Sequence, residues 1–394
     1  MDRKCERDRY KSMRRVFLIN GARSYIGSEN GMYRHMPAEQ LGAAVLRRVA
    51  ASYRNMGIDL VIVGNAVGGG GNIARLALLE AGLSQEIPAF TVDLQCGSGL
   101  ESIVLAAAKI QSGQADLVIA GGFDSSSTAP DRRYHKNHPD YDKYGGKEAW
   151  YSVAKFTPGE HVHTAMLEGA EKVAVAEGIS RQMLDPWVLR SHRLARQARE
   201  SGVLQDIQIQ VAEGCDRDEG IRDRMDQRLL NRLPCVLKNG QVTTAANACL
   251  TNDGSAFVVL CSEQLLDYYG WQPWAEFLGA VEVGDKPEES PRSAITAVRK
   301  VLQRYHYSPE DIAIYECNEA FAVIDELFAR AYPQVVDRYN ILGGALAYGH
   351  PYGASGGIVT LHALKALGSV GGGLAVCSVA AAGGVGTAIL LRSC

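Results

Sequence analysis

Three short stretches of this 394-residue chain place a reactive side chain beside the small residues of a tight turn. In VDLQCGSGLES, Cys96 lies between an apolar strand pattern and an Ala-rich helical pattern. Backbone N–H groups and the helix dipole favour a thiolate at a helix start. The glycines also let a substrate carbonyl approach the Cys96 N–H, which can stabilise an oxyanion. Cys96 is therefore a candidate nucleophile, with simple burial as the alternative.

His350 and Asn318 occupy comparable turns in the second half of the chain. His350 lies in GGALAYGHPYGASGG, and the following proline favours a position just before the next helix. There an imidazole can accept the Cys96 proton or donate to a substrate oxygen, although a structural role is also open. Asn318 lies in YECNEAFAVIDELF, where a strand runs into a helix. Its amide can hold a water or a thioester oxygen, or it can serve only as a helix N-cap.

Alternating strand and helix patterns must position these residues. Short branched apolar runs predict strands at 16–20, 60–64, 116–122, 255–261, 312–317 and 374–379. Helical patterns fall at 38–51, 72–81, 99–111, 294–305, 319–332 and 355–367. This alternation predicts an α/β layered fold.

Two segments of the chain, one in each half, have the same order of predicted elements. GSGLESIVLAAAKI followed by DLVIAGG can be laid on ASGGIVTLHALKAL followed by GLAVCSVAAAGG. Each is a small-residue turn, an Ala-rich helix and a strand that ends in a double glycine. The repeat predicts two similar halves with the site where the equivalent helix N-termini meet.

The domain boundaries follow from composition. Residues 128–247 are polar and rich in turn signals, with an amphipathic helix near 186–201, and they predict an insertion that caps the site. We expect a disordered lead-in at 1–15, an N-terminal half at 16–127 plus 248–270, and a C-terminal half at 271–394.

The overall composition excludes several classes of protein. A net charge of −3 argues against a general nucleic-acid binder. The sequence has no apolar run of 18 residues, so no membrane-spanning helix is predicted. The charged first fifteen residues lack the apolar core of a secretory signal. Nine cysteines without CxxC spacing indicate reduced thiols and no zinc site. We therefore expect a cytoplasmic protein.

The three motifs together resemble those of thiolases. CGSGLES is similar to their acylated-cysteine motif, NEAFA to their asparagine motif and GGALAYGHPYGASG to their histidine motif. The resemblance covers nearly the whole chain from residue 16, and is weakest in the insertion. It implies a five-layered αβαβα fold in a homodimer or dimer of dimers. It also implies coenzyme A thioesters as substrates, with no metal and no permanently bound cofactor.

The resemblance further implies a role for each residue. Cys96 would be acylated by an acyl-CoA while His350 takes its proton. Asn318, through a water, and His350 would form an oxyanion site for the enolate of the second substrate. The Cys96 N–H and one from Ala382 or Gly383 would hold the acyl-enzyme oxygen.

Two regions depart from the family pattern. Ala380 stands where thiolases usually carry a second, acid/base cysteine, and alanine cannot move a proton. Cys377 lies three residues earlier, an offset that points a strand side chain to the opposite face. The usual pantetheine contacts are also altered, which leaves Met166, Ala248 and Cys249 as the candidates. Basic side chains that could meet CoA phosphates, or form only a solvated charged face, are Arg222, Arg224, Arg228, Arg232 and Lys238.

The leading hypothesis is thus an acyltransferase that makes or breaks a carbon–carbon bond between CoA-linked acyl groups. Because of Ala380, two alternatives stay open. One is a decarboxylative, ketosynthase-like condensation or acyl transfer to another acceptor. The other is a degenerate, non-catalytic subunit.

Overall fold

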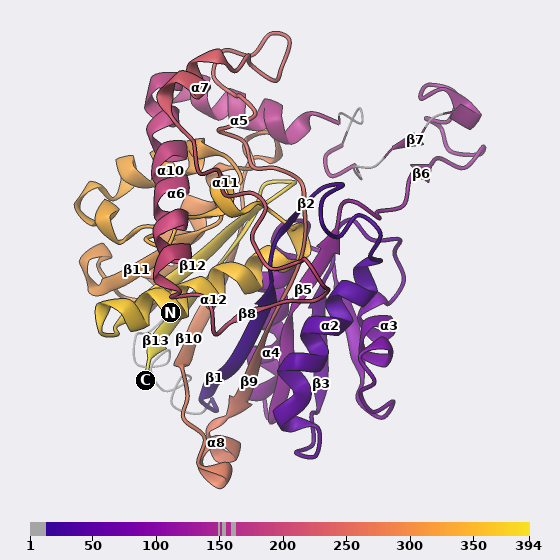
Figure 1. Cartoon of the computed structure of the whole chain (residues 1–394), viewed down its shortest axis with the longest axis vertical. Coiled ribbons are helices and arrows are strands. Elements are labelled where there is room, and N and C mark those ends of the chain that lie inside the picture. Colours follow the sequence, from indigo (N-terminus) through magenta and orange to yellow (C-terminus); the bar gives the residue numbers. More distant parts are fainter. Residues whose placement is uncertain (1–12, 149, 152–154, 159–162) are drawn as a thin grey trace.

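The computed structural model describes residues 13–148, 150–151, 155–158 and 163–394. Of the predicted lead-in, all but residues 13–15 lies outside the described part of the chain. The described residues form two similar halves and a helical insertion (Figure 1).

The N-terminal half is built on five strands in the order β4-β3-β5-β9-β1. Pairing is parallel between β4, β3 and β5 and antiparallel between β5, β9 and β1. The strands are β1 (Val16–Ser24), β3 (Leu60–Gly64), β4 (Ala89–Val92), β5 (Leu117–Ser125) and β9 (Asn252–Ser262). The helices are α2 (Ala38–Ala50), α3 (Ile73–Glu80) and α4 (Ser98–Gln111).

The C-terminal half repeats this pattern, as the sequence predicts. Its strand order is β11-β12-β13-β10, with one parallel pair followed by two antiparallel pairs. The strands are β10 (Ala275–Gly284), β11 (Ile312–Cys317), β12 (Leu374–Ala381) and β13 (Val385–Ser393). The helices are α9 (Arg292–Tyr305), α10 (Ala322–Ala331), α11 (Ala345–Tyr348) and α12 (Tyr352–Val370). The halves join where β1 pairs with β10 at Val16 and Phe277.

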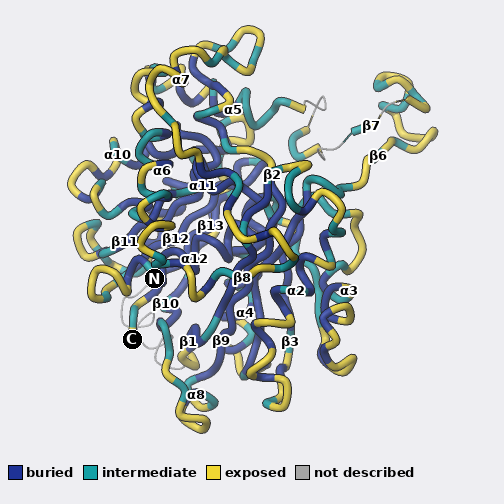
Figure 2. The backbone as a smooth tube through the Cα atoms, in the orientation of Figure 1, coloured by how far each residue is buried: buried dark blue, intermediate teal, exposed yellow. Residues whose placement is uncertain are grey.

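Three large apolar cores lie between the five layers, and the central core covers both faces of the middle helical layer. Along β3, Val61 and Val63 face the core under α2 and α3, whereas Ile62 faces a central core. That central core contains α4, α12 and strand residues from both halves, and a third core lies under α9 and α10. The order helix, strand, helix, strand, helix is the predicted αβαβα arrangement. Figure 2 shows the strands and α12 largely buried at the centre of the molecule.

The insertion packs on the C-terminal half. It contains α5 (Ala165–Ala176), α6 (Arg181–Ser201) and α7 (Gln227–Arg232). The α6 helix packs on α10 and α11, and the Trp187 indole donates to Glu326 Oε2 at 3.1 Å. The short strands β6 (Arg132–Arg133) and β7 (Trp150–Tyr151) extend away from the body (Figure 1). The remaining short elements are β2 (Gly27–Ser28), β8 (Gln208–Ile209) and α8 (Glu263–Tyr269).

A seam of glycines brings the starts of α4 and α12 together. A Cβ atom added at Gly99 would overlap the Gly353 carbonyl oxygen, and one at Gly356 would overlap the Leu100 amide. A Cβ at Gly122 would likewise overlap the Gly353 oxygen. Only glycine permits this approach of one backbone to another. The seam thus joins the turn before α4 to the turn before α12.

We expect Gly356→Ala to lower the free energy of unfolding by about 2–3 kcal/mol, because its methyl group has no space beside Leu100. Urea unfolding followed by circular dichroism measures this. Gly368→Ala is the matched control, since it lies in the same helix with no atom within 4 Å of the added Cβ. The control is expected to be neutral or stabilising by up to about 1 kcal/mol. Equal stability of the two variants would contradict the seam.

Candidate active site

Cys96 lies in the turn between β4 and α4, two residues before the first residue of the helix. The preceding Gln95 has φ 51°, a left-handed conformation that is costly for a residue with a side chain. Its amide donates to Asp93 Oδ1 at 2.9 Å, and the Ser98 N–H donates to the Gln95 carbonyl at 3.0 Å. These bonds hold the turn and fix the direction of the Cys96 side chain.

Burial dominates the electrostatics of the Cys96 thiol, which is 8% exposed. Burial, followed by the negative charge of Asp124, raises the pKa of Cys96 to about 12, although the N–H groups of Cys96 and Ala382 lower it. The helix start therefore does not produce a resident thiolate, contrary to the expectation from local sequence. Loss of hydration outweighs the N–H groups, and the thiol is neutral until a base takes its proton.

The two N–H groups at the sulfur have a second consequence. The interaction of Ala382 with Cys96 brings the loop after β12 against the turn before α4. Two converging backbone donors at a nucleophile can stabilise the oxygen of an acyl adduct. This supports the prediction that the N–H groups of Cys96 and Ala382 hold the acyl-enzyme oxygen. Gly383, the other candidate donor, has φ 89°, and a Cβ added there would approach the Phe156 carbonyl of the insertion.

His350 is fixed on three sides in the turn before α12. Its N–H donates to Asn252 Oδ1 at 2.9 Å, and it pairs with Thr251. Its Nδ1 lies 2.6 Å from Ser355 Oγ, and that hydroxyl donates to the Pro351 carbonyl at 2.9 Å. Because one hydroxyl proton cannot serve both bonds, Ser355 accepts from Nδ1–H. Nε2, which has Asn318 Nδ2 at 3.3 Å, is then the ring nitrogen whose lone pair can accept a proton.

The imidazole of His350 is neutral at physiological pH. It is 1% exposed, and burial lowers its pKa to about 3. A neutral imidazole beside a neutral thiol can take the thiol proton only as the sulfur attacks. The site is therefore suited to a proton transfer that accompanies bond formation rather than to a standing ion pair.

Asn318 lies beside His350. Its Nδ2 is 3.4 Å from Nδ1 and 3.3 Å from Nε2 of the imidazole. The helix predicted at 319–332 begins only at Ala322, with Phe321 as its N-cap. The N-cap alternative for Asn318 is therefore wrong. Residues 318–321 stay irregular because Ala248 pairs with Phe321 and because Glu319 accepts a bond from Ser191 Oγ at 2.6 Å.

The structure brings together most of the predicted site. Cys96 lies with Ala382 and Asn318 lies with His350, the close approach of Gly99 and Gly353 joins the two turns, and the Ala248–Cys249 segment lies against the Asn318 loop. Cys377 is directed away, as its offset along β12 predicts: its Sγ donates to the Val359 carbonyl at 3.8 Å, in the central core. Sequence analysis did not single out Ser355, although GASGG follows His350 directly.

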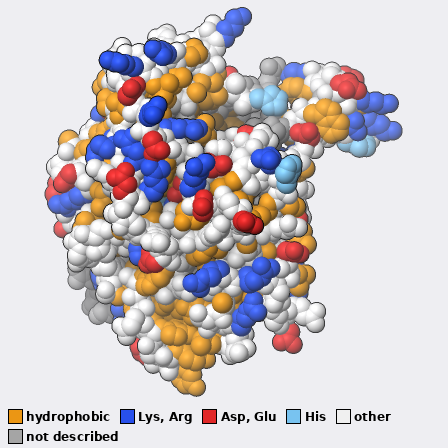
Figure 3. Space-filling model, in the orientation of Figure 1, with side chains coloured by type: hydrophobic (Ala, Val, Ile, Leu, Met, Phe, Trp, Pro, Cys, Tyr) orange, Lys and Arg blue, Asp and Glu red, His pale blue; other side chains and the backbone are white. Residues whose placement is uncertain are grey.

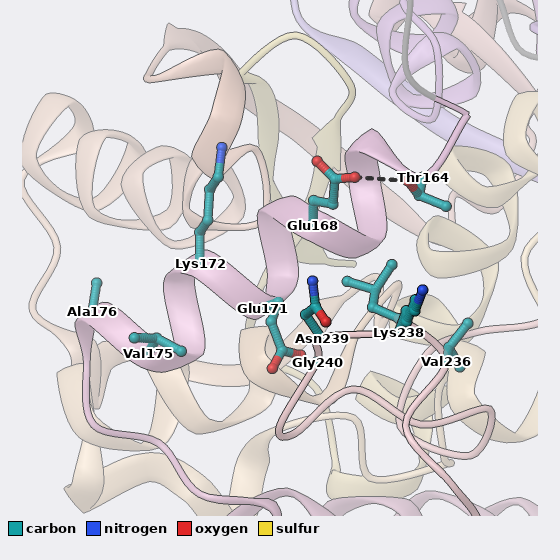
Figure 4. Close-up of a pocket in the computed structure, with 11 residues that line it drawn as sticks. Thr164, Glu168, Glu171, Lys172, Val175, Ala176, Val236, Lys238, Asn239 and Gly240 are labelled. Carbon is teal, nitrogen blue, oxygen red and sulfur yellow. Dashed lines mark hydrogen bonds between the residues drawn. The ribbon is translucent and has the colours of Figure 1, made fainter.

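A cavity of about 760 Å³ lies apart from these residues. Figure 4 shows it between α5 and residues 236–240, with Glu168, Glu171, Lys172 and Lys238 in its lining. Cys96, Asn318 and His350 do not line this cavity. We therefore locate the candidate site by these three residues rather than by the size of the cavity. Lys238 lines this cavity, whereas Met166, also in α5, does not and packs on the core under α9 and α10.

The basic residues considered for CoA phosphates are exposed. Figure 3 shows Lys and Arg side chains interspersed with Asp and Glu. The Arg199 guanidinium contacts Asp223 at 2.5 Å, and the Arg196 side chain donates to the Arg222 carbonyl at 3.4 Å.

Within the described residues, no helix is long and apolar enough to cross a bilayer.

Comparisons with known proteins give one consistent result. Residues 16–264 match the family "Thiolase, N-terminal domain", and residues 271–393 match "Thiolase, C-terminal domain". VraB of Staphylococcus aureus strain MRSA252, named as a candidate acetyl-CoA C-acetyltransferase, is 36% identical over 87% of this chain and 91% of its own length. YhfS of Bacillus subtilis strain 168, named in the same way, is 33% identical over 95% of this chain and 98% of its own length.

Solved structures agree with this result. The Bacillus anthracis acetyl-CoA acetyltransferase superposes with a TM-score of 0.88 and 28% identity, over 97% of this chain and 99% of its own. The human mitochondrial 3-ketoacyl-CoA thiolase in complex with CoA gives a TM-score of 0.88 and 29% identity, over 97% and 98% of the two chains.

The raised pKa of Cys96 predicts how its alkylation depends on pH. A thiol below its pKa gains thiolate about tenfold per pH unit, so we expect iodoacetamide labelling of Cys96 to accelerate throughout pH 7–10 without a plateau. Peptide mass spectrometry measures the rate. A free thiol of ordinary pKa, about 8.5, serves as the reference and should level off within the range. A plateau for Cys96 below pH 8 would instead indicate a resident thiolate.

Proposed function

The chain belongs to the thiolase family and is an acyltransferase, and we propose that Cys96 carries the acyl group between coenzyme A thioesters. This proposal is carried by two backbone donors at a buried thiol and by a neutral imidazole held by Ser355, in the turns before two helices whose first turns are in contact. That arrangement supports the following first half-reaction. As the Cys96 sulfur attacks the carbonyl carbon of an acyl-CoA, its proton passes to His350 Nε2.

The remaining groups stabilise the oxygens on which negative charge develops. The N–H groups of Cys96 and Ala382 would hold the acyl-enzyme oxygen. The Asn318 amide, through a water, and His350 would bind the oxygen of the enolate formed from the second CoA thioester. Preorganised donors of this kind contribute most when they are removed from water, and all of these groups are buried.

The names of the relatives support a short acyl group. Two relatives are named for acetyl-CoA C-acetyltransferase, and a solved neighbour for acetyl-CoA acetyltransferase. A second solved neighbour is a 3-ketoacyl-CoA thiolase bound to CoA. These names favour acyl transfer between CoA thioesters over the decarboxylative alternative. We propose that Met166 and Ala248 lie along the path of the pantetheine arm, with Cys249 at the reactive end of that path.

A homodimer or dimer of dimers is part of the proposal. The strand β4 lies at the edge of the sheet, and its Phe90 and Val92 are only half-buried. An apolar edge strand of this kind favours pairing with another chain. We expect sedimentation velocity to give at least twice the mass of 42.6 kDa. A monomer would contradict this part of the proposal.

Incubation with acetyl-CoA should add one acetyl group to the protein, on Cys96. Intact-protein mass spectrometry, followed by peptide mapping, measures the adduct. We expect no adduct on Cys96→Ala and acylation slowed about 10²–10⁴-fold in His350→Ala, which lacks the base. Cys394→Ser, which changes an exposed cysteine, is the control and should acylate normally. A wild type without adduct, or an equal adduct on Cys96→Ala, would refute the proposed function.

A further inference from the structure

The proposed reaction has a second proton to move. When no carboxyl group is lost, a carbon–carbon bond beside a thioester carbonyl forms or breaks with transfer of a proton at the α-carbon. His350 is occupied by the proton of Cys96. The methyl group of Ala380, which stands at the position expected for a proton carrier, cannot do this. The following inference rests on the proposed function and identifies the missing group.

The backbone places Cys249 between the two loops of the site. Its N–H donates to the Ala320 carbonyl at 2.9 Å, two residues beyond Asn318. Two residues further along the same segment, Thr251 pairs with His350. The segment therefore runs from the Asn318 loop to the His350 loop with Cys249 between its two attachments.

The side chains of this region form one cluster. The thiols of Cys249 and Cys96 are close enough to interact electrostatically, and the phenol of Tyr352 interacts with both. The Tyr352 ring lies edge-on to the His350 imidazole, with 4.9 Å between ring centres. The segment that carries Cys249 is thus attached to both loops of the site, and its thiol lies within electrostatic range of Cys96 and of the phenol that packs on His350.

Other titratable groups of the cluster are less suited to the second proton. Asp124 accepts from the Asn65 amide at 2.7 Å and from the Gly353 N–H at 2.6 Å, so its carboxylate is committed to the backbone. Burial raises the pKa of the Tyr352 phenol well above its ordinary value. Cys377 lies in the central core, against Val359.

We propose that Cys249 is the second catalytic thiol, which exchanges the α-carbon proton of the CoA-linked substrate in place of the side chain that Ala380 lacks. In the cleavage direction, the Cys96 sulfur bonds to the 3-oxo carbon and the bond between C2 and C3 breaks. The electron pair remains on C2 as an enolate, which takes the Cys249 proton. Cys96 is left acylated, Cys249 is left as a thiolate and His350 is protonated.

The second half restores both groups. Free coenzyme A gives its thiol proton to Cys249, and its sulfur attacks the acyl group on Cys96. The Cys96 sulfur leaves and takes back the proton from His350. Burial raises the pKa of the Cys249 thiol, so its resting form carries the proton that the first half requires.

The experiment separates the two half-reactions. Acylation of Cys96 by acetyl-CoA needs no α-proton transfer, whereas cleavage of acetoacetyl-CoA and exchange of acetyl-CoA α-protons in D₂O both need it. The variants are Cys249→Ser, which keeps size and polarity, and the double variant Cys249→Ser/Ala380→Cys. Cys235→Ser is the matched control, a half-buried cysteine in the nearby loop that pairs with Thr244.

We expect kcat for cleavage, and the rate of α-proton exchange, to fall about 10²-fold or more in Cys249→Ser. Cys96 acylation should stay within a few-fold of wild type, and Cys235→Ser should match wild type in every assay. Partial recovery of cleavage in the double variant would show that a thiol at 380 supplies the same proton. The proposal is overturned if Cys249→Ser changes only KM, as a pantetheine contact would, or if acylation and cleavage fall equally. Failure of the proposed function itself would instead appear as a wild type that is never acylated.

Discussion

The close approach of two helix starts is the constraint on which the site depends. Cys96 precedes α4 and His350 precedes α12, and these helices come from opposite halves of the chain. The two turns can meet because Gly99, Gly353 and Gly356 have no side chains at the contact. A repeated strand–turn–helix unit thus becomes a single site when its two copies face each other, each contributing a different reactive group.

Burial sets the chemistry of that site. Desolvation acts on Cys96 and His350 in the same direction, toward the neutral form, although it raises one pKa and lowers the other. A neutral pair does not store a thiolate, so proton transfer is coupled to the arrival of a carbonyl carbon. The backbone N–H groups of Cys96 and Ala382 then serve the oxygen of the adduct more than the sulfur of the resting enzyme.

The segment that returns from the insertion links the loops of the site. Between Ala248 and Asn252 it pairs with Phe321, bonds to Ala320 and binds the His350 N–H. This segment also carries Cys249, which makes it both a support for the base and the source of a second thiol. Replacement of a cysteine at 380 by alanine is compatible with catalysis if the proton carrier lies on this neighbouring segment.

The sequence by itself determined the α/β class and the repeated halves, and it singled out Cys96, Asn318 and His350 as candidates, because strand and helix periodicity and turn composition are local properties. It also predicted that Cys377 faces away from the site, since side chains alternate along a strand. It misjudged the start of α10 and the state of the thiol. Helix propensity does not depend on the distant residues 248–249, which pair with 320–321 and delay the start of α10. The position of Cys96 before a helix likewise does not reveal how far burial raises the pKa of its thiol. Only the tertiary structure placed Cys249 between the Asn318 and His350 loops, because Cys249 lies 153 positions after Cys96 and nothing local links the two.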